Sequence, residues 1–138
     1  MSDLSHIPVM LDEVIAGLHL SAGDVIVDGT LGGAGYALAM VEHGATVEGF
    51  DRDPRAIERA RPLAARHAGL RLHNRNFSDM ADVLGAASVD GVALDLGYST
   101  IQMDDPAYGL SFQQNGPLDM RLSGEGMSAA DFVNSASE

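Results

Sequence analysis

A glycine-rich turn between a short apolar run and a helix-like segment constrains this chain more than any other feature. The run Val25–Val27 leads into residues 28–35 (DGTLGGAG), and a second apolar run ends in an acid at Asp51. Glycines let the backbone approach a ligand closely, and the following helix directs free N–H groups toward negative groups. A carboxylate at the tip of the second strand can accept both hydroxyls of a ribose. The pattern predicts a binding site for an adenosine-containing cofactor.

The apolar pattern predicts that strands and helices alternate along most of the chain. Strands are expected at residues 25–27, 46–50, 70–73 and 89–94, and helices at 11–20, 35–43, 54–68 and 79–84. Continuous β-branched runs such as the first are typical of strands covered on both faces. Because this alternation favours right-handed crossovers, we expect an α/β fold with a parallel sheet.

The segment after the second strand carries its own helix signals. Asp53 followed by Pro54 is typical of an N-cap acid and a proline at the first helical position. If Asp53 caps the helix, Asp51 remains available for a ligand. Pro62 falls inside the helical pattern, and we expect it to kink or split the helix.

Composition narrows the class of protein. A chain of 138 residues is long enough for one domain, and it has no apolar run of the ~20 residues that span a membrane. It also lacks a signal peptide and cysteine, so we expect a cytoplasmic protein without disulfides. No histidines and acids have convincing metal spacing, and His6 and His73 are expected to be structural or surface residues.

The charge balance argues against nucleic-acid binding by the chain as a whole. The chain has twenty acidic residues, eight arginines and no lysine, which gives a net charge of −12. Affinity for phosphate backbones depends on clustered cations, so a nucleic-acid function would need a local basic patch or sequence outside this chain. The simpler interpretation is that acidity keeps a small protein soluble.

A second informative motif, Asp95-Leu96-Gly97-Tyr98-Ser99, follows the fourth expected strand. Ligands of parallel α/β sheets bind beyond the carboxyl ends of the strands. An acid, a turn and an aromatic resemble the Asp-Pro-Pro-Tyr signature of amino-group methyltransferases, where acceptors hold a weakly nucleophilic amine in line with the methyl donor. An aromatic ring can stack on an extruded base. A polar connection without function is the alternative.

Beyond this motif the chain changes character. Residues 97–127 are rich in Gly, Pro, Ser, Asp and Gln, which predicts a long irregular stretch that is either a functional loop or disordered. Ser128 then caps a last helix expected at residues 129–135.

The sequence resembles a known family, the bacterial small-subunit rRNA (cytosine-N4)-methyltransferases of the RsmH or MraW type. The segments that carry the resemblance are His6–Val14, Asp28–Thr30, Gly32–Tyr36, Asp51–Pro54, Asn76–Ser78, Asp95–Gly97, Gln102–Asp105, Gly109–Phe112, Gly116–Arg121 and Asn134–Glu138. They cover nearly the whole chain. The family transfers a methyl group from S-adenosylmethionine to N4 of a cytidine in small-subunit rRNA.

The resemblance implies a set of cofactor-binding residues. These are Ala34, Gly35 and Tyr36 for the methionine and ribose side, Asp51 for the ribose, Phe77 for the adenine region, and Asp95 and Gln102 for the part nearest the methyl group. Asp95 would also serve as the catalytic residue that meets the target amine. From the residues alone, Phe77 either stacks on the base or fills the core.

The resemblance also implies a fold and a division of the chain. A Rossmann-like class I methyltransferase has a doubly wound parallel sheet of seven strands, of which this chain would supply the first four. Residues 1–96 would form the S-adenosylmethionine-binding half-domain, and residues 97–138 a substrate-side loop with the start of a helical insertion. Family members are about twice as long, and Ala34 and Leu38 stand where glycine and arginine are common.

Three functions remain open from the sequence. The first is rRNA methylation by a short form of the family, and the second is a non-catalytic module that binds S-adenosylmethionine or another protein. A nicotinamide-dependent oxidoreductase is the third, although residues 29–35 lack the G-x-G-x-x-G spacing. The fourth strand belongs in mid-sheet, so its edge is expected to be free for self-association or for pairing with another chain.

Overall fold

The computed structural model describes residues 8–137, so His6 lies outside the described part. These residues divide into two compact units, one that ends at Leu96 and one that begins at Gly97. The first unit contains α1 (Leu11–Leu18), β1 (Val25–Asp28), α2 (Gly35–Glu42), β2 (Thr46–Phe50), α3 (Pro54–Ala64), β3 (Leu70–His73), η1 (Phe77–Asp79), α4 (Met80–Leu84) and β4 (Gly91–Ala93). The second contains α5 (Thr100–Asp104), η2 (Pro106–Tyr108) and α6 (Ala129–Ser135).

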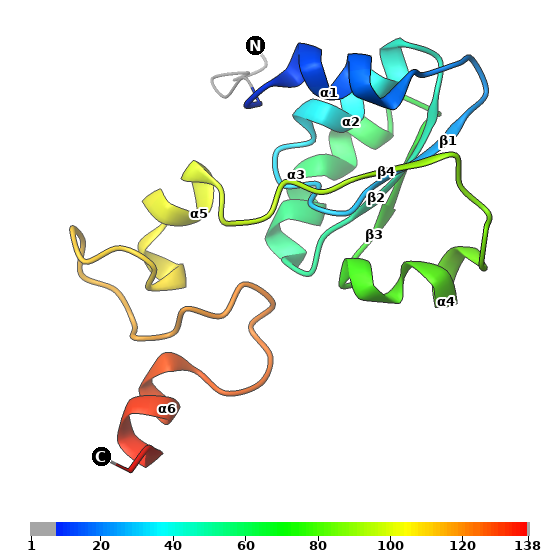
Figure 1. The fold of residues 1–138 in the computed structure, drawn as a ribbon. Coiled ribbons are helices and arrows are strands. Elements are labelled where there is room, and N and C mark those ends of the chain that lie inside the picture. Colours follow the sequence, from blue (N-terminus) through cyan, green and yellow to red (C-terminus); the bar gives the residue numbers. More distant parts are fainter. Residues whose placement is uncertain (1–7, 138) are drawn as a thin grey trace. The chain divides into compact units, whose positions relative to one another are not determined.

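The four strands form one parallel sheet in the order β3-β2-β1-β4, as the alternation predicts (Figure 1). From β1 to β3 the chain moves toward one edge, and it then crosses back to place β4 on the other side of β1. Right-handed crossovers therefore put α2 and α3 on one face and α4 on the opposite face. All four carboxyl ends share one edge of the sheet, and β4 is an edge strand.

The core of the first unit lies between the sheet and the helices on one face. Its buried apolar side chains are Ile26, Leu31, Ala34, Ala37, Met40, Ala45, Val47, Ile57, Ala60 and Leu70. Strand β1 is a continuous apolar run up to its final acid, as expected of a strand with both faces covered, whereas β2 carries Glu48 and Gly49 among its buried residues.

A buried acid ties the edge strand β3 to the sheet. Glu48 on β2 is 3% exposed, and it accepts hydrogen bonds from Arg71 Nη1 at 2.7 Å and pairs with His73 Nε2 at 2.7 Å. His73 also stacks on Phe50 with ring centroids 4.5 Å apart. Buried charges need such partners. His73 is therefore a structural residue, as expected.

The helix signals after β2 are confirmed in part. Asp53 caps α3 by accepting a hydrogen bond from the backbone N–H of Arg55 at 2.9 Å, and Pro54 is the first helical residue. Pro62 does not split the helix, which continues to Ala64. A proline this close to the end removes a single backbone hydrogen bond, with almost no helix left beyond it to disrupt.

The second unit is more ordered than the composition predicts. Within residues 97–127, which we expected to be irregular, Thr100–Asp104 forms α5 and Pro106–Tyr108 forms η2. A capping box between Ser99 and Gln102 begins α5, with each side chain bonded to the backbone N–H of the other. So short a helix shows no apolar period, which is why its composition misled the prediction. Helix α6 has the predicted bounds and Ser128 cap.

Candidate functional site

The glycine turn after β1 is held by the two neighbouring strands. The N–H of Gly29 donates to the carbonyl of Ala93 on β4 at 3.0 Å, and the N–H of Leu31 donates to the carbonyl of Phe50 on β2 at 3.0 Å. The Thr30 hydroxyl accepts a hydrogen bond from the N–H of Asp95 at 2.7 Å. The turn therefore brings the ends of β1, β2 and β4 together at the carboxyl edge.

Close packing explains why a glycine begins the turn. A Cβ atom on Gly29 would lie 2.4 Å from Leu94 Cδ2 and 2.9 Å from Phe77 Cβ, distances that no real Cβ contact tolerates. The half-buried Phe77 in η1 thus packs against the turn. The predicted contact of Phe77 with adenine stays a prediction.

Two predicted residues, Ala34 and Gly35, contribute backbone rather than side chains. Ala34 is the N-cap of α2, is completely buried and has φ 64° and ψ 19°, a left-handed conformation that costs an alanine about 1 kcal/mol. A glycine there would avoid that cost. Gly35 lies against Pro8, whose Cγ would be 2.4 Å from an added Cβ.

Asp51 is half-buried and already holds two backbone donors. Its Oδ2 accepts from the N–H of Gly32 at 2.8 Å, and its Oδ1 accepts from the N–H of Asp53 at 2.9 Å. Burial raises the pKa of Asp51, while these two amides oppose that shift. Asp51 therefore already holds two backbone donors, and its predicted contact with a ribose stays a prediction. Each oxygen retains a lone pair, so a ribose can still bind to a carboxylate that is already oriented.

Asp28, for which the sequence pattern indicated no separate role, is the most unusual group of the site. It is 1% exposed, and its Oδ1 accepts a hydrogen bond from the N–H of Thr30 at 3.2 Å. Its Oδ2 has no hydrogen-bond partner in the described structure. The N–H of Ala37 stabilises the carboxylate weakly, without a bond of normal geometry to Oδ2.

The environment of Asp28 disfavours its charged form. Burial is the largest cause that raises the pKa of Asp28 to about 7, and the negative charges of Asp51 and Asp95 add to it. The hydrogen bond from Thr30 partly offsets these effects. An acid as the last residue of a buried strand was the signal in the sequence that could have identified this position.

Tyr36 connects α2 to Asp95. Its hydroxyl donates to the carbonyl of Val9 at 2.5 Å and lies 3.4 Å from Asp95 Oδ2. Burial, followed by the negative charge of Asp95, raises the pKa of Tyr36, so the phenol stays protonated and able to donate. The structure thus brings together Tyr36 and Asp95, two of the predicted residues.

A cavity of about 410 Å³ opens beside these groups. Its polar end is formed by Asp28, Thr30, Tyr36 and Asp95. The rest of its wall is mostly apolar and comes from the segment before α1, from α1 and from β4: Val9, Met10, Val14, Gly17, Leu18, Val92, Ala93 and Leu94. A mostly apolar cavity with a few convergent polar groups is the usual form of a small-molecule site. Asp51 and Phe77 are not part of its wall.

Gln102 belongs to the second unit, where it has a structural role. Its side chain is 5% exposed, and its Oε1 accepts a hydrogen bond from the N–H of Ser99 at 3.0 Å. The predicted contact of Gln102 with the cofactor stays a prediction.

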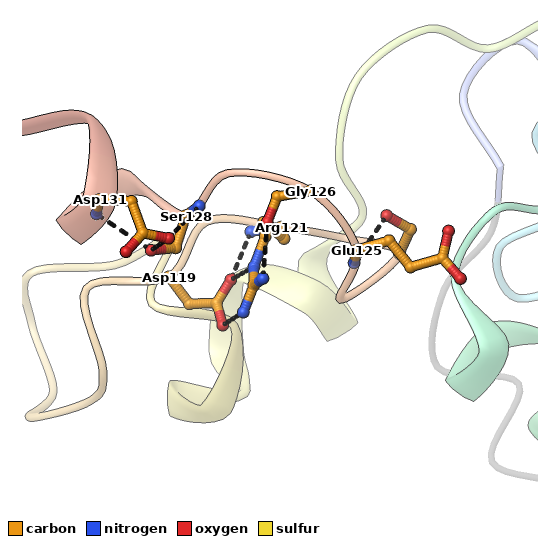
Figure 2. Close-up of polar contacts among 7 residues, drawn as sticks. Asp119, Arg121, Glu125, Gly126, Ser128 and Asp131 are labelled. Carbon is orange, nitrogen blue, oxygen red and sulfur yellow. Dashed lines mark hydrogen bonds and ion pairs between the residues drawn. The ribbon is translucent and has the colours of Figure 1, made fainter. Parts of the chain in front are cut away.

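The second unit also contains an ion pair within the motif Gly116–Arg121 (Figure 2). The Arg121 guanidinium donates to both carboxylate oxygens of Asp119 at 2.7 and 2.9 Å, and to the carbonyl of Gly126 at 2.9 Å. Ser128 and Asp131 form the capping box of α6 beside it. These contacts hold the loop before α6, because bidentate pairs fix geometry as well as adding energy.

Two classes of feature are not found within residues 8–137. No group of three or more histidines and acids could hold a metal ion. None of the helices described there has the length and apolar character needed to cross a membrane.

Comparison with known proteins identifies the family. A family model described as the MraW methylase family matches residues 3–138. The chain belongs to the MraW methylase family. The parallel α/β sheet and the glycine turn are thus those of a methyltransferase family.

Curated relatives in this family share about half of the residues. The ribosomal RNA small subunit methyltransferase H of Rhizobium johnstonii is 52% identical over 132 residues, which cover 95% of this chain and 39% of that protein. The protein of the same name from Rhizorhabdus wittichii is 52% identical over 137 residues, which cover 96% and 42%. The chain therefore spans about two fifths of the length of these relatives and corresponds to their N-terminal part.

The raised pKa of Asp28 predicts a pH-dependent stability. Between the unperturbed pKa of 3.8 and about 7 the folded state holds a proton that the unfolded state has lost, so this group lowers the free energy of unfolding as pH rises through that window. Asp28→Asn keeps an acceptor for Thr30 and removes the charge. We expect the variant to be more stable than the wild type above pH 7, by on the order of 4 kcal/mol.

Urea unfolding of both proteins at several pH values measures this difference. It should shrink as pH falls below about 7, because protonation then removes the buried charge from the wild type as well. Asp82→Asn, a change at an exposed position of α4, is the matched control and should show no such dependence. A difference that stays constant with pH would contradict the assignment.

Proposed function

We propose that this chain binds S-adenosylmethionine at the carboxyl edge of its sheet and forms the cofactor-binding part of an enzyme that methylates N4 of a cytidine in small-subunit rRNA. The observation that carries the proposal is the convergence of Asp28, Asp51 and Asp95 around a glycine turn beside a cavity. Family membership and the names of the relatives support it. The methylation would take place in the cytoplasm, where the ribosomal subunit is available.

The residues at this edge fit such a cofactor. S-adenosylmethionine carries two positive groups, and the buried oxygen of Asp28 that lacks a donor marks a place for one of them. In the proposed arrangement Asp51 holds the ribose and Phe77 the adenine region. Ala34, Gly35, Tyr36 and Asp95 surround the methionine part and the methyl group.

Asp95 is the proposed catalytic residue. The cofactor supplies an electrophilic methyl group when it is bound, and the target amine of cytosine is a weak nucleophile. A carboxylate that accepts an N–H of this amine orients the nitrogen lone pair, and it can receive the proton that the nitrogen loses. The hydrogen bond from the N–H of Asp95 to the Thr30 hydroxyl, at 2.7 Å, holds this residue at the glycine turn.

A non-catalytic module that keeps the cofactor site is the second candidate. The net charge of −12 without lysine favours it, because such a chain repels RNA as a whole. Transfer of a labelled methyl group to small-subunit particles distinguishes the two functions. Detectable transfer supports the enzyme, and binding of S-adenosylmethionine without transfer supports the module.

The distribution of arginines favours RNA as a partner despite the net charge. Seven of the eight arginines, but only two of the twenty acids, lie in residues 52–75, which include α3 and β3. All seven are exposed. Ion pairs join Arg59 to Asp53, Arg61 to Glu58 and Arg71 to Glu48. This segment, which we call the arginine segment, is the local basic patch that nucleic-acid binding requires.

The free edge of β4 is a further surface for a partner. Gly91–Ala93 pairs with β1 on one side, and its other edge is not paired within the described sheet. Val92 and Leu94 beside it are 42% and 44% exposed. Unpaired strand edges invite pairing with another chain. We therefore propose self-association of this chain across β4.

Titration calorimetry tests cofactor binding. We expect S-adenosylmethionine to bind and NAD not to bind, because residues 29–35 lack the dinucleotide spacing. Asp51→Asn should weaken binding about tenfold or more, since it removes an acceptor for the ribose. Asp82→Asn is the control and should bind as the wild type does. Binding of NAD in place of S-adenosylmethionine would exclude the proposal.

Binding of a fluorescent small-subunit rRNA fragment tests the arginine segment. Replacing both Arg66 and Arg75 by glutamine should reduce affinity several-fold and make its dependence on salt less steep, because two phosphate contacts are lost. Ala86→Glu combined with Ser137→Asp, at two exposed positions outside the arginine segment, lowers the net charge by the same amount and is the control for a change in charge alone. Equal losses in the two proteins would show that net charge, and not this surface, governs binding.

Size-exclusion chromatography over a range of concentrations tests the β4 edge. We expect the apparent mass to rise with concentration, and Val92→Lys to suppress the rise because a charged side chain opposes edge pairing. Val83→Lys, in α4 and similarly exposed at 41%, is the matched control. A monomer at every concentration would rule out self-association.

A further inference from the structure

The loop that follows η2 presents a completely exposed aromatic side chain. Phe112 is 100% exposed, more than any other large apolar side chain in the described part of the chain. The residues after it, from Gln113 to Pro117, are exposed as well. We call residues 109–117 the phenylalanine loop. Because single apolar residues are common on protein surfaces, the surroundings of Phe112 decide whether its exposure has a function.

Both ends of the phenylalanine loop are packed closely against neighbouring backbone. A Cβ atom on Gly109, which has φ 66°, would overlap the carbonyl oxygen of Pro117. A Cβ atom on Gly116 would overlap the carbonyl oxygen of Pro106. Only glycine permits so close an approach, and these two contacts anchor the loop at both of its ends. Phe112 lies between the anchors, so its ring is presented on a supported loop.

Carboxamides and the absence of charge distinguish the tip of this loop. Gln113, Gln114 and Asn115 follow Phe112, and residues 106–118 contain no charged residue. The side chains of Gln113 and Asn115 form no hydrogen bond to the part of the chain that the structure describes. A carboxamide offers donors and an acceptor side by side, and the edges of nucleic-acid bases present the complementary pattern.

An unpaired RNA base fits this surface better than a protein partner does. A protein interface needs an apolar core formed by several residues, but the residues that follow Phe112 are amides. A single ring is sufficient to stack on a base, and stacking tolerates any base because each has a π face. In a chain of net charge −12, the loop also lacks acids that would repel a phosphate backbone. Asp119, the first acid beyond it, is paired with Arg121 (Figure 2).

We propose that the phenylalanine loop binds single-stranded RNA, with Phe112 stacked on an unpaired base and the carboxamides of Gln113 and Asn115 bonded to base edges. This inference rests on the proposed function and assigns part of the RNA binding to the second unit. The loop and the arginine segment contact different parts of the RNA. Arginines attract phosphates, which every RNA carries, whereas the phenylalanine loop contacts base faces and edges, which a duplex conceals.

Fluorescence anisotropy with two labelled RNAs tests the inference. One is a single-stranded fragment of small-subunit rRNA, and the other is a hairpin in which the same nucleotides are paired. Phe112→Ala removes the ring, Phe112→Leu keeps an apolar side chain without a π face, and Phe112→Trp keeps a ring that stacks. Phe132→Ala, in α6 and 61% exposed, is the matched control. Because Phe112 is fully exposed, its replacement should leave the midpoint of urea unfolding unchanged.

We expect Phe112→Ala and Phe112→Leu to bind the single strand about tenfold more weakly than the wild type, and Phe112→Trp to stay within about twofold of it. The dependence on salt should not change in any of them, because no phosphate contact is lost. Affinity for the hairpin should also stay the same. Replacing both Gln113 and Asn115 by alanine should reduce the differences in affinity among oligonucleotides of adenosine, cytidine and uridine.

A second measurement detects stacking directly. The chain contains no tryptophan, so Phe112→Trp introduces a single fluorescent reporter. Its emission should be quenched when the single strand binds, because the indole ring then stacks on a base. The emission of Phe132→Trp should not be quenched.

Other results overturn the inference. If Phe112→Ala binds the single strand as the wild type does, or if Phe132→Ala loses as much affinity, Phe112 is not an RNA contact, although the proposed function stands. Full affinity in Phe112→Leu would exclude stacking, and equal losses for the single strand and the hairpin would exclude a contact with unpaired bases. If the wild type binds neither RNA, the inference and the proposed RNA target fail together. Calorimetry with S-adenosylmethionine then tests the cofactor part of the proposed function separately.

Discussion

The candidate site depends on backbone hydrogen bonds that join one turn to two strands. Because Gly29 bonds to the end of β4 and Leu31 to the end of β2, the turn cannot move without disturbing the sheet. The Thr30 hydroxyl extends the same connection to Asp95. A polar site is most precise where regular elements support it, and here three strands support a single turn.

The same arrangement concentrates negative charge where water is scarce. The negative charges of Asp51 and Asp95 both repel that of Asp28, and burial makes the charged forms of Asp28 and Asp51 less favourable. Backbone N–H groups donate to Asp28 Oδ1 and to both carboxylate oxygens of Asp51, and the positive charge of Arg59 also favours the charged form of Asp51. A positively charged ligand would reduce the repulsion, so a destabilised free site and an attractive bound site have the same physical origin.

Local sequence patterns predicted the parts of the fold that depend on local chemistry. Buried β-branched runs predicted the strands, and Asp53 with Pro54 predicted the start of α3, because each signal lies within a few residues of its effect. The bonds that Asp51 accepts could be foreseen less well, since the Gly32 donor lies nineteen residues away in the chain. The burial of Asp28 and the lack of a hydrogen-bond partner for its Oδ2 depend on packing from several elements, which no local pattern describes.

Two features were overlooked for a different reason, because their signals were present in the sequence. Ser99 followed by Gln102 three residues later is a capping-box pattern that indicates a helix start, but the surrounding composition favoured an irregular stretch. The concentration of arginines in residues 52–75 was also present in the sequence, but the net charge of the whole chain does not reveal it. Average properties of a segment are thus poor guides where a few residues determine the structure.

The contact between Pro8 and Gly35 links parts of the chain that are far apart in sequence. The proline ring occupies the space that a side chain at position 35 would need, and the Tyr36 hydroxyl bonds to the next residue, Val9. The segment before α1 and the start of α2 are therefore two halves of one interlocking surface. A bulkier residue in either half demands a compensating change in the other, so these positions are expected to vary in evolution as a pair.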